Sequence, residues 1–322
     1  MFSYRHAFHA GNHADVLKHT VLIATLEHLL EKDTALTVVD THAGAGLYRL
    51  DGDYAGTSGE AADGVLRLLA AKQEAAPVAA AALAQGPAKK PAAKTAVAPD
   101  APLAPAIQSY LDLIRAFNPN GGSRVYPGSP FITHHLLREH DKLKLFELHP
   151  TDARTLDANI AQLEAGRQIA VLREDGFGSA TKFLPPPSRR ALVLCDPSYE
   201  MKTDYGRVLD LIGESLKRFA TGTYAVWYPI IPRPEAHDLP RRLKTMATKA
   251  GKSWLHATLT VKSSKILTTV TGDQKRPGLP ASGMFLINPP YTLKGRLQPA
   301  LEQLKVLLAQ DRHAAFSLDR GG

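Results

Sequence analysis

The chain has 322 residues, 44% of them hydrophobic, so it can bury a sizeable core in one large α/β domain or in two ordinary ones. Its formal net charge of +8 attracts a polyanion such as nucleic acid, although many basic proteins bind none. A single cysteine, Cys195, excludes an internal disulfide and a thiolate metal cluster. The sequence has no signal peptide and no apolar run of roughly 20 residues, which predicts a cytoplasmic protein without membrane contact.

The first predicted elements are a helix over residues 12–32 and a strand over residues 36–39. Asn12 is a good N-cap, Asp15 complements the positive end of the helix dipole, and leucines then recur at helical spacing. The strand is short and apolar, and it runs into a glycine-bearing turn over residues 40–46. A glycine turn at the end of a first strand is typical of ligand-binding α/β folds.

Six more short apolar runs predict further strands. They cover residues 143–148, 169–172, 191–195, 224–228, 255–261 and 284–287. Stretches such as residues 151–163 and 205–219 separate most of them and are long enough for crossover helices. The pattern predicts a doubly wound α/β fold with a mainly parallel, seven-stranded sheet covered by helices on both faces.

Two segments interrupt this alternation. Residues 47–125 are far longer than an ordinary connection and predict an inserted helical subdomain, which leaves residues 1–46 and 126–322 to the main domain. Within the insertion, residues 75–105 are almost entirely Ala, Pro, Lys, Gln and Gly, a composition typical of a mobile surface linker. Residues 262–280 carry basic side chains and predict either a substrate-facing loop or a solvated hairpin.

The turn after the first strand is the predicted cofactor site. Gly44 and Gly46 have no Cβ, so the backbone there can approach a ligand closely. A dinucleotide fingerprint needs a third glycine where this chain has Arg49, and a P-loop needs Gly-Lys-Ser/Thr, which the sequence lacks. The turn therefore favours S-adenosylmethionine over a dinucleotide or a nucleoside triphosphate.

Acidic residues follow the next two strands in chain order. Glu147 is placed to accept hydrogen bonds from vicinal ribose hydroxyls, and Asp175 with Gly176 is placed to bind an adenine edge. Each acid alone also fits a helix N-cap or a surface charge. We expect the first helix to pack beside the glycine turn, with Lys18 and His19 near the cofactor carboxylate.

The tetrapeptide Asp196-Pro197-Ser198-Tyr199 is the predicted catalytic centre. An exocyclic base amine is a poor nucleophile, so an enzyme must orient its lone pair toward the methyl carbon. The Asp196 carboxylate and the Pro197 carbonyl can accept its two N–H groups, and Tyr199 can stack on the base. No metal is needed. The alternative is a strand that simply ends in a proline turn.

Three other motifs compete for this role. Asn288-Pro289-Pro290-Tyr291 is a cleaner match to the amino-methyltransferase pattern, but it follows the last predicted strand and no glycine turn comes after it. Cys195 suggests attack on a pyrimidine, but strand alternation turns Cys195 and Asp196 to opposite faces. Histidines near the N-terminus suggest a metal site, but their spacing matches no common ligand set; these residues are His6, His9, His13 and His19.

Motifs spread over nearly the whole chain resemble the family of bacterial 23S ribosomal RNA adenine-N6 methyltransferases called RlmJ. They are Tyr4-Arg5-His6, the run from Phe8 to His19, the turn from Asp40 to Gly46, Tyr126 to Pro130, Glu147 to Pro150, and Asp196 to Tyr205. The resemblance implies a class I S-adenosylmethionine-dependent methyltransferase fold, Rossmann-like, with a small helical insertion. It implies N6-methylation of a single adenine in 23S rRNA that is free of ribosomal proteins, without a metal.

The resemblance also implies roles for individual residues. Tyr4 would lie close to the target base and Asp196 would be the catalytic carboxylate. The cofactor site would be lined by Lys18, His19, His42, Ser129, Glu147, Asp175 and Gly176. The chain departs from the family pattern at Ser198, where the motif has a second proline, and around residues 86–99, where a surface loop is longer.

Other functions remain compatible with these residues. A non-catalytic RNA-binding or ribosome-assembly factor would keep the fold and the charge, and a DNA amino-methyltransferase would use the same chemistry. The leading hypothesis is an RNA adenine-N6 methyltransferase that acts as a monomer.

Overall fold

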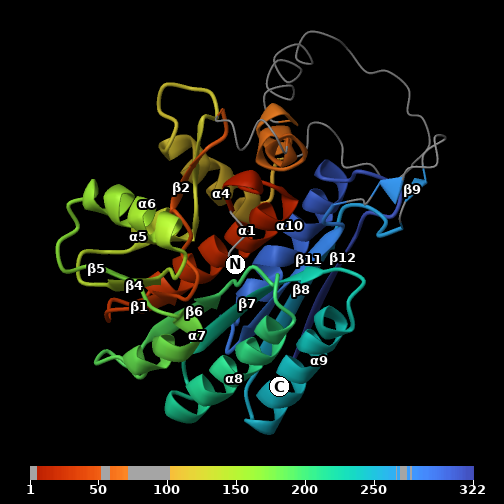
Figure 1. Cartoon of the computed structure of the whole chain (residues 1–322). Coiled ribbons are helices and arrows are strands. Elements are labelled where there is room, and N and C mark those ends of the chain that lie inside the picture. The colour runs from red at the N-terminus through yellow and green to blue at the C-terminus, as the bar shows by residue number, and fades with distance from the viewer. Residues whose placement is uncertain (1–5, 52–58, 72–101, 266, 269–273, 276–277) are drawn as a thin grey trace.

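An eight-stranded mixed sheet forms the centre of the molecule in the computed structural model, which describes residues 6–51, 59–71, 102–265, 267–268, 274–275 and 278–322 (Figure 1). In sheet order the strands are β12 (Ala315–Gly321), β8 (Trp254–Thr260), β11 (Ala281–Ile287), β7 (Thr223–Ile230), β6 (Ala191–Cys195), β1 (Thr37–Asp40), β4 (Lys142–Phe146) and β5 (Ile169–Leu172). Neighbouring strands from β5 to β7 are parallel, and each pair from β7 to β12 is antiparallel.

The predicted fold class is confirmed, and all seven predicted strands lie in this sheet. The eighth strand, β12, is absent from the prediction. It pairs with β8 at the sheet edge, where most of its residues are only partly buried or exposed. An edge strand that is not buried on both faces lacks the continuous apolar run that marks the other strands.

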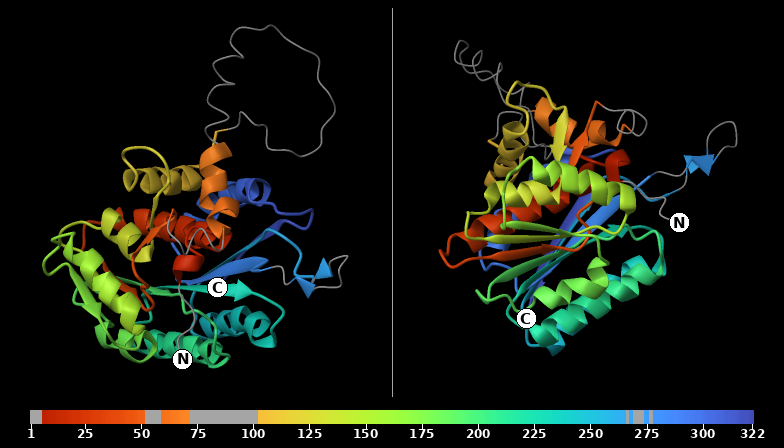
Figure 2. Two further views of the ribbon diagram at one scale, coloured as in Figure 1. Left: turned by 45° about the horizontal axis from the view of Figure 1, so that its top comes forward. Right: turned by 60° about the vertical axis from the view of Figure 1, so that its left-hand side comes forward.

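Helices cover both faces of the sheet (Figures 1 and 2). On one face lie α1 (His13–Leu30), α4 (Pro105–Ala116), α5 (Ser129–Leu136), α6 (Pro150–Ala161) and α10 (Leu293–Leu307). On the other lie α7 (Gly176–Ser179), the 3-10 helix η3 (Ala180–Phe183), α8 (Thr203–Arg218) and α9 (Pro234–Lys249). Strand alternation divides the core accordingly, because Leu194 belongs to the cluster under α1 and Cys195 to the cluster under α8.

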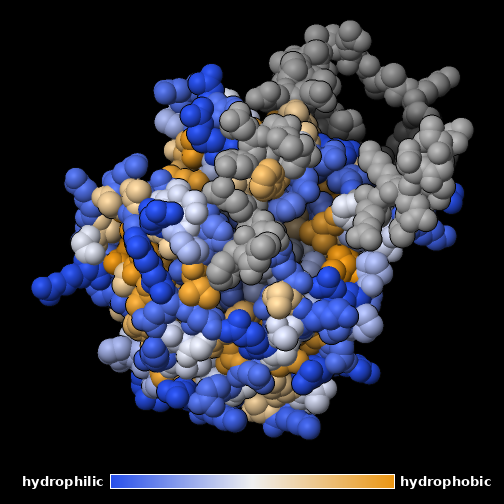
Figure 3. Space-filling model, in the orientation of Figure 1, coloured by the Kyte–Doolittle hydropathy of each residue, from blue (hydrophilic) through white to orange (hydrophobic). Residues whose placement is uncertain are grey.

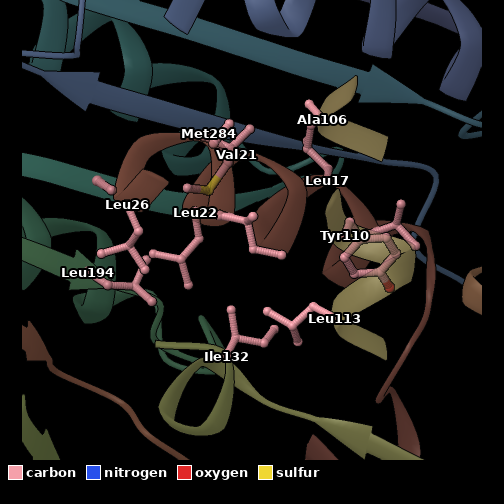
Figure 4. Packing of buried hydrophobic residues seen from close by; sticks show 14 of the residues in the cluster. Leu17, Val21, Leu22, Leu26, Ala106, Tyr110, Leu113, Ile132, Leu194 and Met284 are labelled. Carbon is pink, nitrogen blue, oxygen red and sulfur yellow. The ribbon is translucent and has the colours of Figure 1, made fainter. Parts of the chain in front are cut away.

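Helix α1 lies at the centre of its layer, and most of its length is buried. Asn12 caps it as predicted, because the Asn12 side chain accepts hydrogen bonds from the backbone N–H groups of Ala14 and Asp15. Its apolar side chains pack against α4, α5, β6 and β11, as Figure 4 shows for Leu22 and Leu26. This packing holds the polar start of the same helix against the carboxyl ends of the parallel strands.

The remaining described elements are short. They are the 3-10 helices η1 (His6–Phe8) and η2 (Glu60–Asp63), a helix over residues 65–71, the paired strands β2 (Leu47–Arg49) and β3 (Val125–Pro127), and the paired strands β9 (Leu267–Thr268) and β10 (Gln274–Lys275).

The described parts of the predicted insertion, residues 47–125, share the core of the main domain. Val65 and Leu68 of the helix over residues 65–71 and Tyr110 of α4 belong to the same buried cluster as α1. Gly64 allows this close approach, because a Cβ there would lie 2.1 Å from the Gly11 carbonyl oxygen. The linker predicted at residues 75–105 lies mostly outside the described residues.

In the orientation of Figure 3 the described surface is mostly hydrophilic, with apolar side chains in separate patches. Within the described part of the chain, no helix is long and apolar enough to span a bilayer.

Candidate active site

A cavity of about 610 Å³ opens at the carboxyl ends of β1, β4 and β6, beside the N-terminal half of α1. Carboxyl ends of parallel strands are where α/β folds bind their ligands. Of the residues predicted for the site, those that line the cavity are Lys18, His19, His42, Gly44, Ser129, Glu147, Asp175, Gly176, Asp196, Pro197 and Tyr199. The fold therefore brings together residues that the sequence spreads from position 18 to position 199.

Asp196 follows β6 and is paired with Lys18 from α1. The Lys18 Nζ lies 2.5 Å from Asp196 Oδ2 and 2.9 Å from Asp15 Oδ1. Burial lowers the pKa of Lys18, but the attraction of Asp15 and Asp196 outweighs burial, so the net pKa lies above its ordinary value. Lys18 is therefore an ammonium that fixes the Asp196 carboxylate at the cavity wall.

Asp15 is the second carboxylate that contacts the Lys18 ammonium. Its Oδ2 accepts hydrogen bonds from the Gly11 backbone N–H at 2.9 Å and from His6 Nε2 at 3.0 Å, and the side chain is almost fully buried. Burial raises the pKa of Asp15, but His6 and Lys18 outweigh it and hold this pKa well below its ordinary value. Asp15 is thus a buried anion that orients Lys18 from within the same helix.

The glycine turn holds a second buried carboxylate, Asp40, which the cavity does not expose. Ser129 Oγ donates to Asp40 Oδ2 at 2.6 Å and the His42 backbone N–H donates to Oδ1 at 3.2 Å. Burial raises the pKa of Asp40 to about 6, and these two hydrogen bonds only partly oppose that rise. Asp40 ties α5 to the turn and so places Ser129 at the cavity wall.

Glu147 and Asp175 border the same cavity at the ends of β4 and β5. Glu147 accepts backbone hydrogen bonds from Gly44 at 2.8 Å and from His149 at 2.7 Å, which fixes its carboxylate beside the glycine turn. Asp175 caps the short helix α7 by accepting from the Phe177 N–H, and it is paired with Arg207. The fold thus holds both carboxylates at the cavity wall, and their contact with an adenosyl group stays a prediction.

His19 is the clearest sign that this cavity takes a polar ligand. Its Nδ1 is hydrogen-bonded to the Tyr126 hydroxyl at 2.7 Å, whereas its buried Nε2 has no partner among the described residues. Burial lowers the pKa of His19 to about 3, so the imidazole is neutral at physiological pH. A buried nitrogen without a partner at a cavity wall fits a bound cofactor that supplies one, and the hydrogen-bond acceptors of Glu147 and Asp175 fit the hydroxyl and amine donors of an adenosyl group.

Tyr199 lines the cavity but offers little of its ring. Only 2% of the residue is exposed, its hydroxyl donates to the Trp227 carbonyl oxygen at 2.6 Å, and its ring packs on Tyr205 with the centroids 4.6 Å apart. Its φ of 55° is uncommon for a bulky residue and indicates local strain at the turn. The predicted stacking of a base on Tyr199 stays a prediction.

Other predicted residues lie elsewhere. Gly46 does not line the cavity; it accommodates packing, because a Cβ there would lie 2.9 Å from both Leu156 and Phe131. Tyr4 lies outside the described residues. Asn288 follows β11, which runs antiparallel to β7, so it lies near the amino ends of the parallel strands, whereas Asp196 lies at their carboxyl ends. The Asn288 side-chain amide donates to the carbonyl oxygens of Ala220 and Gly222.

Several cavity residues were missed by the sequence analysis. Tyr48, Glu60 and Trp227 line the cavity, but no local pattern marks them, because their placement depends on contacts between distant segments. Asp15 was predicted only as a helix-start residue, and its spacing of three residues from Lys18 was the available signal. Among the described residues no three His, Cys, Asp or Glu side chains are grouped so as to hold a metal ion.

Known proteins match this chain over nearly its whole length. The family model described as "Ribosomal RNA large subunit methyltransferase D, RlmJ" matches residues 33–86 and 79–318. The chain is 40% identical over 319 residues to ribosomal RNA large subunit methyltransferase J of Escherichia coli K12, with 98% of each chain covered. It is 37% identical to the protein of that name from Haemophilus influenzae, covering 99% of this chain and 98% of that one.

A solved structure supports the whole-chain fold. Protein LPL1258 from Legionella pneumophila superposes with a TM-score of 0.74 at 28% identity, covering 97% of this chain and 98% of that one. The fold and the cavity at its strand ends define a class I methyltransferase. The family match and the identity over nearly the full length go further: this chain belongs to the RlmJ family of ribosomal RNA large subunit methyltransferases. It is an enzyme, and its cofactor is S-adenosylmethionine.

Proposed function

We propose that the protein transfers a methyl group to the N6 amine of a single adenine in 23S rRNA. The observation that carries this proposal is the Asp196 carboxylate, fixed by Lys18 at the wall of a cavity that also contains the glycine turn. The ribosomal RNA substrate comes from the relatives' names, and the amine chemistry comes from the tetrapeptide that begins at Asp196.

The reaction needs the amine lone pair to point at the methyl carbon. In the proposed arrangement Asp196 and the Pro197 carbonyl accept the two N–H groups, which leaves the lone pair directed away from both acceptors. Lys18 already binds Asp196 Oδ2, so Asp196 presents its remaining acceptor capacity to the amine. As the amine gains positive charge, the carboxylate stabilises it and takes the surplus proton, which then passes to water.

The cofactor supplies an electrophilic methyl group bound to a sulfonium. We assign its binding to the cavity residues of the glycine turn and of the strand ends. They are Gly44, His42, Ser129, Glu147, Asp175, Gly176 and His19. Glu147 would accept from the ribose hydroxyls, Asp175 would accept from the adenine amine, and the unpartnered Nε2 of His19 would complete the polar wall. Lys18 lines the same cavity and contacts Asp15 and Asp196, and its ammonium would also attract the cofactor carboxylate.

We propose further that the enzyme is a cytoplasmic monomer that uses no metal and acts on 23S rRNA before ribosomal proteins cover the target. Incubation of the protein with unmodified, protein-free 23S rRNA and methyl-labelled cofactor tests the reaction. Digestion and mass spectrometry should place the label in N6-methyladenine at one site. Binding of the RNA with no label in any nucleoside would indicate an assembly factor, and transfer to DNA of matched sequence at an equal rate would indicate a DNA enzyme.

A further inference from the structure

A buried chain of hydrogen bonds ends at His19 on the cavity wall. Tyr110 Oη lies 3.2 Å from Tyr126 Oη, which lies 2.7 Å from His19 Nδ1, and all three residues are fully buried. They come from α4, β3 and α1, so the chain connects the predicted insertion to the cavity wall. Resting on the assignment of His19 to the cofactor in the function proposed above, we infer that Tyr126 is a positioning residue that fixes His19 as a hydrogen-bond donor.

The direction of the hydrogen bonds follows from the protons that they must hold. Burial lowers the pKa of His19 to about 3, so its imidazole is neutral and carries one ring proton. Among the described residues the Tyr110 hydroxyl has no partner besides Tyr126. If Tyr110 donates to Tyr126 and Tyr126 donates to His19 Nδ1, both hydroxyl protons are bonded. The reverse direction would leave the Tyr110 proton buried without an acceptor, which is the more costly arrangement.

The ring proton of His19 is therefore on Nε2. This nitrogen is buried and has no partner among the described residues, whereas a buried N–H group ordinarily has an acceptor. His19 lines the cavity and Tyr126 does not, so Nδ1 is bound on the side away from the cavity and Nε2 is the ring nitrogen left for a ligand. A bound cofactor would supply the missing acceptor.

The carboxylate is the cofactor group that fits this donor best. A hydrogen bond to an ionised acceptor is stronger than one to a neutral acceptor. Lys18 lines the same cavity, so its ammonium and the His19 N–H would together attract an anion and disfavour the ammonium and the sulfonium of the cofactor. The acceptors Glu147 and Asp175 are suited instead to the hydroxyl and amine donors of the adenosyl part. Tyr126 would thus act on one end of the cofactor.

Heteronuclear NMR of the histidine side chains tests the direction of the chain in the wild-type protein. The resonances of His19 are identified by their absence from His19→Leu. In wild type the Nε2 of His19 should carry the proton and the Nδ1 should be unprotonated. A proton on His19 Nδ1 in wild type would overturn the inference, and this measurement decides even if a tyrosine variant fails to fold.

Calorimetry with two ligands tests what Tyr126 does for the cofactor. Tyr126→Phe keeps the buried ring and removes the hydroxyl, so affinity for S-adenosylhomocysteine should fall by roughly three- to tenfold, the value of one hydrogen bond. Affinity for decarboxylated S-adenosylhomocysteine, which lacks the carboxylate alone, should stay within about twofold of wild type. Tyr110→Phe is the matched control, because it removes a buried hydroxyl from the same chain and leaves Tyr126 able to donate to His19. Both affinities should stay within about twofold there.

The outcomes separate this inference from the function on which it rests. Equal losses for the two ligands in Tyr126→Phe, or no loss for either, would overturn the role of Tyr126. Unchanged S-adenosylhomocysteine affinity in His19→Leu would overturn the assignment of His19 to the cofactor and the inference with it. A wild type that binds S-adenosylhomocysteine but makes no N6-methyladenine would overturn the proposed reaction and leave the role of Tyr126 standing.

Discussion

The Lys18 ammonium lies 2.5 Å from the Asp196 carboxylate, although the two residues are 178 positions apart in the sequence. The contact exists because α1 is buried along most of its length and its polar N-terminal half therefore meets the end of β6. Lys18 also lies 2.9 Å from the buried Asp15, and the pKa of that carboxyl is held well below its ordinary value, with His6 and Lys18 outweighing burial. In the proposed reaction the Lys18–Asp196 pair holds a carboxylate beside the amine on which positive charge develops.

Asp15 should control the position of Lys18. Asp15→Asn keeps the size of the side chain but removes the buried anion, so we expect a loss of about 3 kcal/mol in the free energy of unfolding. Methyl transfer should fall as well, because Lys18 is then held from one side only. Urea unfolding and single-turnover assays measure the two effects. Asp51→Asn, at an exposed ion pair with Arg49, is the matched control and should change neither.

Asp40 should make stability depend on pH. Folding raises its pKa from 3.8 to about 6, so its contribution is fully present below the unfolded value and is lost as the pH rises through about 6. Asn at this position resembles the protonated form. The stability of Asp40→Asn relative to wild type should therefore rise by up to about 3 kcal/mol between about pH 4 and pH 7. Denaturant unfolding at several pH values measures it, and a difference independent of pH would contradict the assignment.

Ser198 is the residue at which this chain departs from the family motif. It is exposed, and its backbone N–H makes no hydrogen bond within the described residues, so a proline there removes no donor that the fold uses. Ser198→Pro should raise the free energy of unfolding by about 0.5–1 kcal/mol and leave methyl transfer equal or faster. Thermal unfolding and initial rates provide the measurement. A large loss of activity would show that the serine has a role of its own.

Asn288 should matter for stability and not for catalysis. Its amide donates to the carbonyls of Ala220 and Gly222, and its φ is 52°, a conformation that alanine tolerates poorly. Asn288→Ala should cost about 1–3 kcal/mol of stability, with unchanged kcat for the folded enzyme. Asn288→Gly separates the two causes, because glycine accepts this φ but cannot donate the two side-chain hydrogen bonds. Reduced kcat in a fully folded Asn288→Gly sample would contradict this assignment.

The sequence predicted the parts of the fold that local patterns encode. Each parallel strand is an apolar run, and the Asn12 cap and the glycine turn are local signals. The sequence analysis therefore placed the strands, the cap and the turn correctly. Because the carboxyl ends of parallel strands meet at one sheet edge, Gly44, Glu147, Asp175 and Asp196 were predicted to lie together, and they line one cavity. Strand order also separated Asp196 from the better motif match at Asn288.

Contacts between residues that are far apart in the sequence could not be predicted from sequence patterns. Lys18 was expected near the cofactor carboxylate, and its pairing with Asp196 depends on how deeply α1 is buried. The burial of the Tyr199 ring depends on Trp227 and Tyr205, which belong to other elements. Trp227 itself lies within an ordinary apolar strand pattern, so nothing in the sequence marked it as a cavity residue. Tertiary packing decides such placements.

Replacement of Asp196 tests the central claim most directly. We predict that Asp196→Ala lowers single-turnover methyl transfer to protein-free 23S rRNA by about a hundred- to a thousandfold, because one preorganised charge-stabilising group is lost. Affinity for S-adenosylhomocysteine, measured by calorimetry on the same sample, should stay within about twofold of wild type, because Asp196 acts on the amine. Transfer by Asp196→Ala at a rate close to wild type would contradict the account and move the catalytic centre away from the Lys18–Asp196 pair.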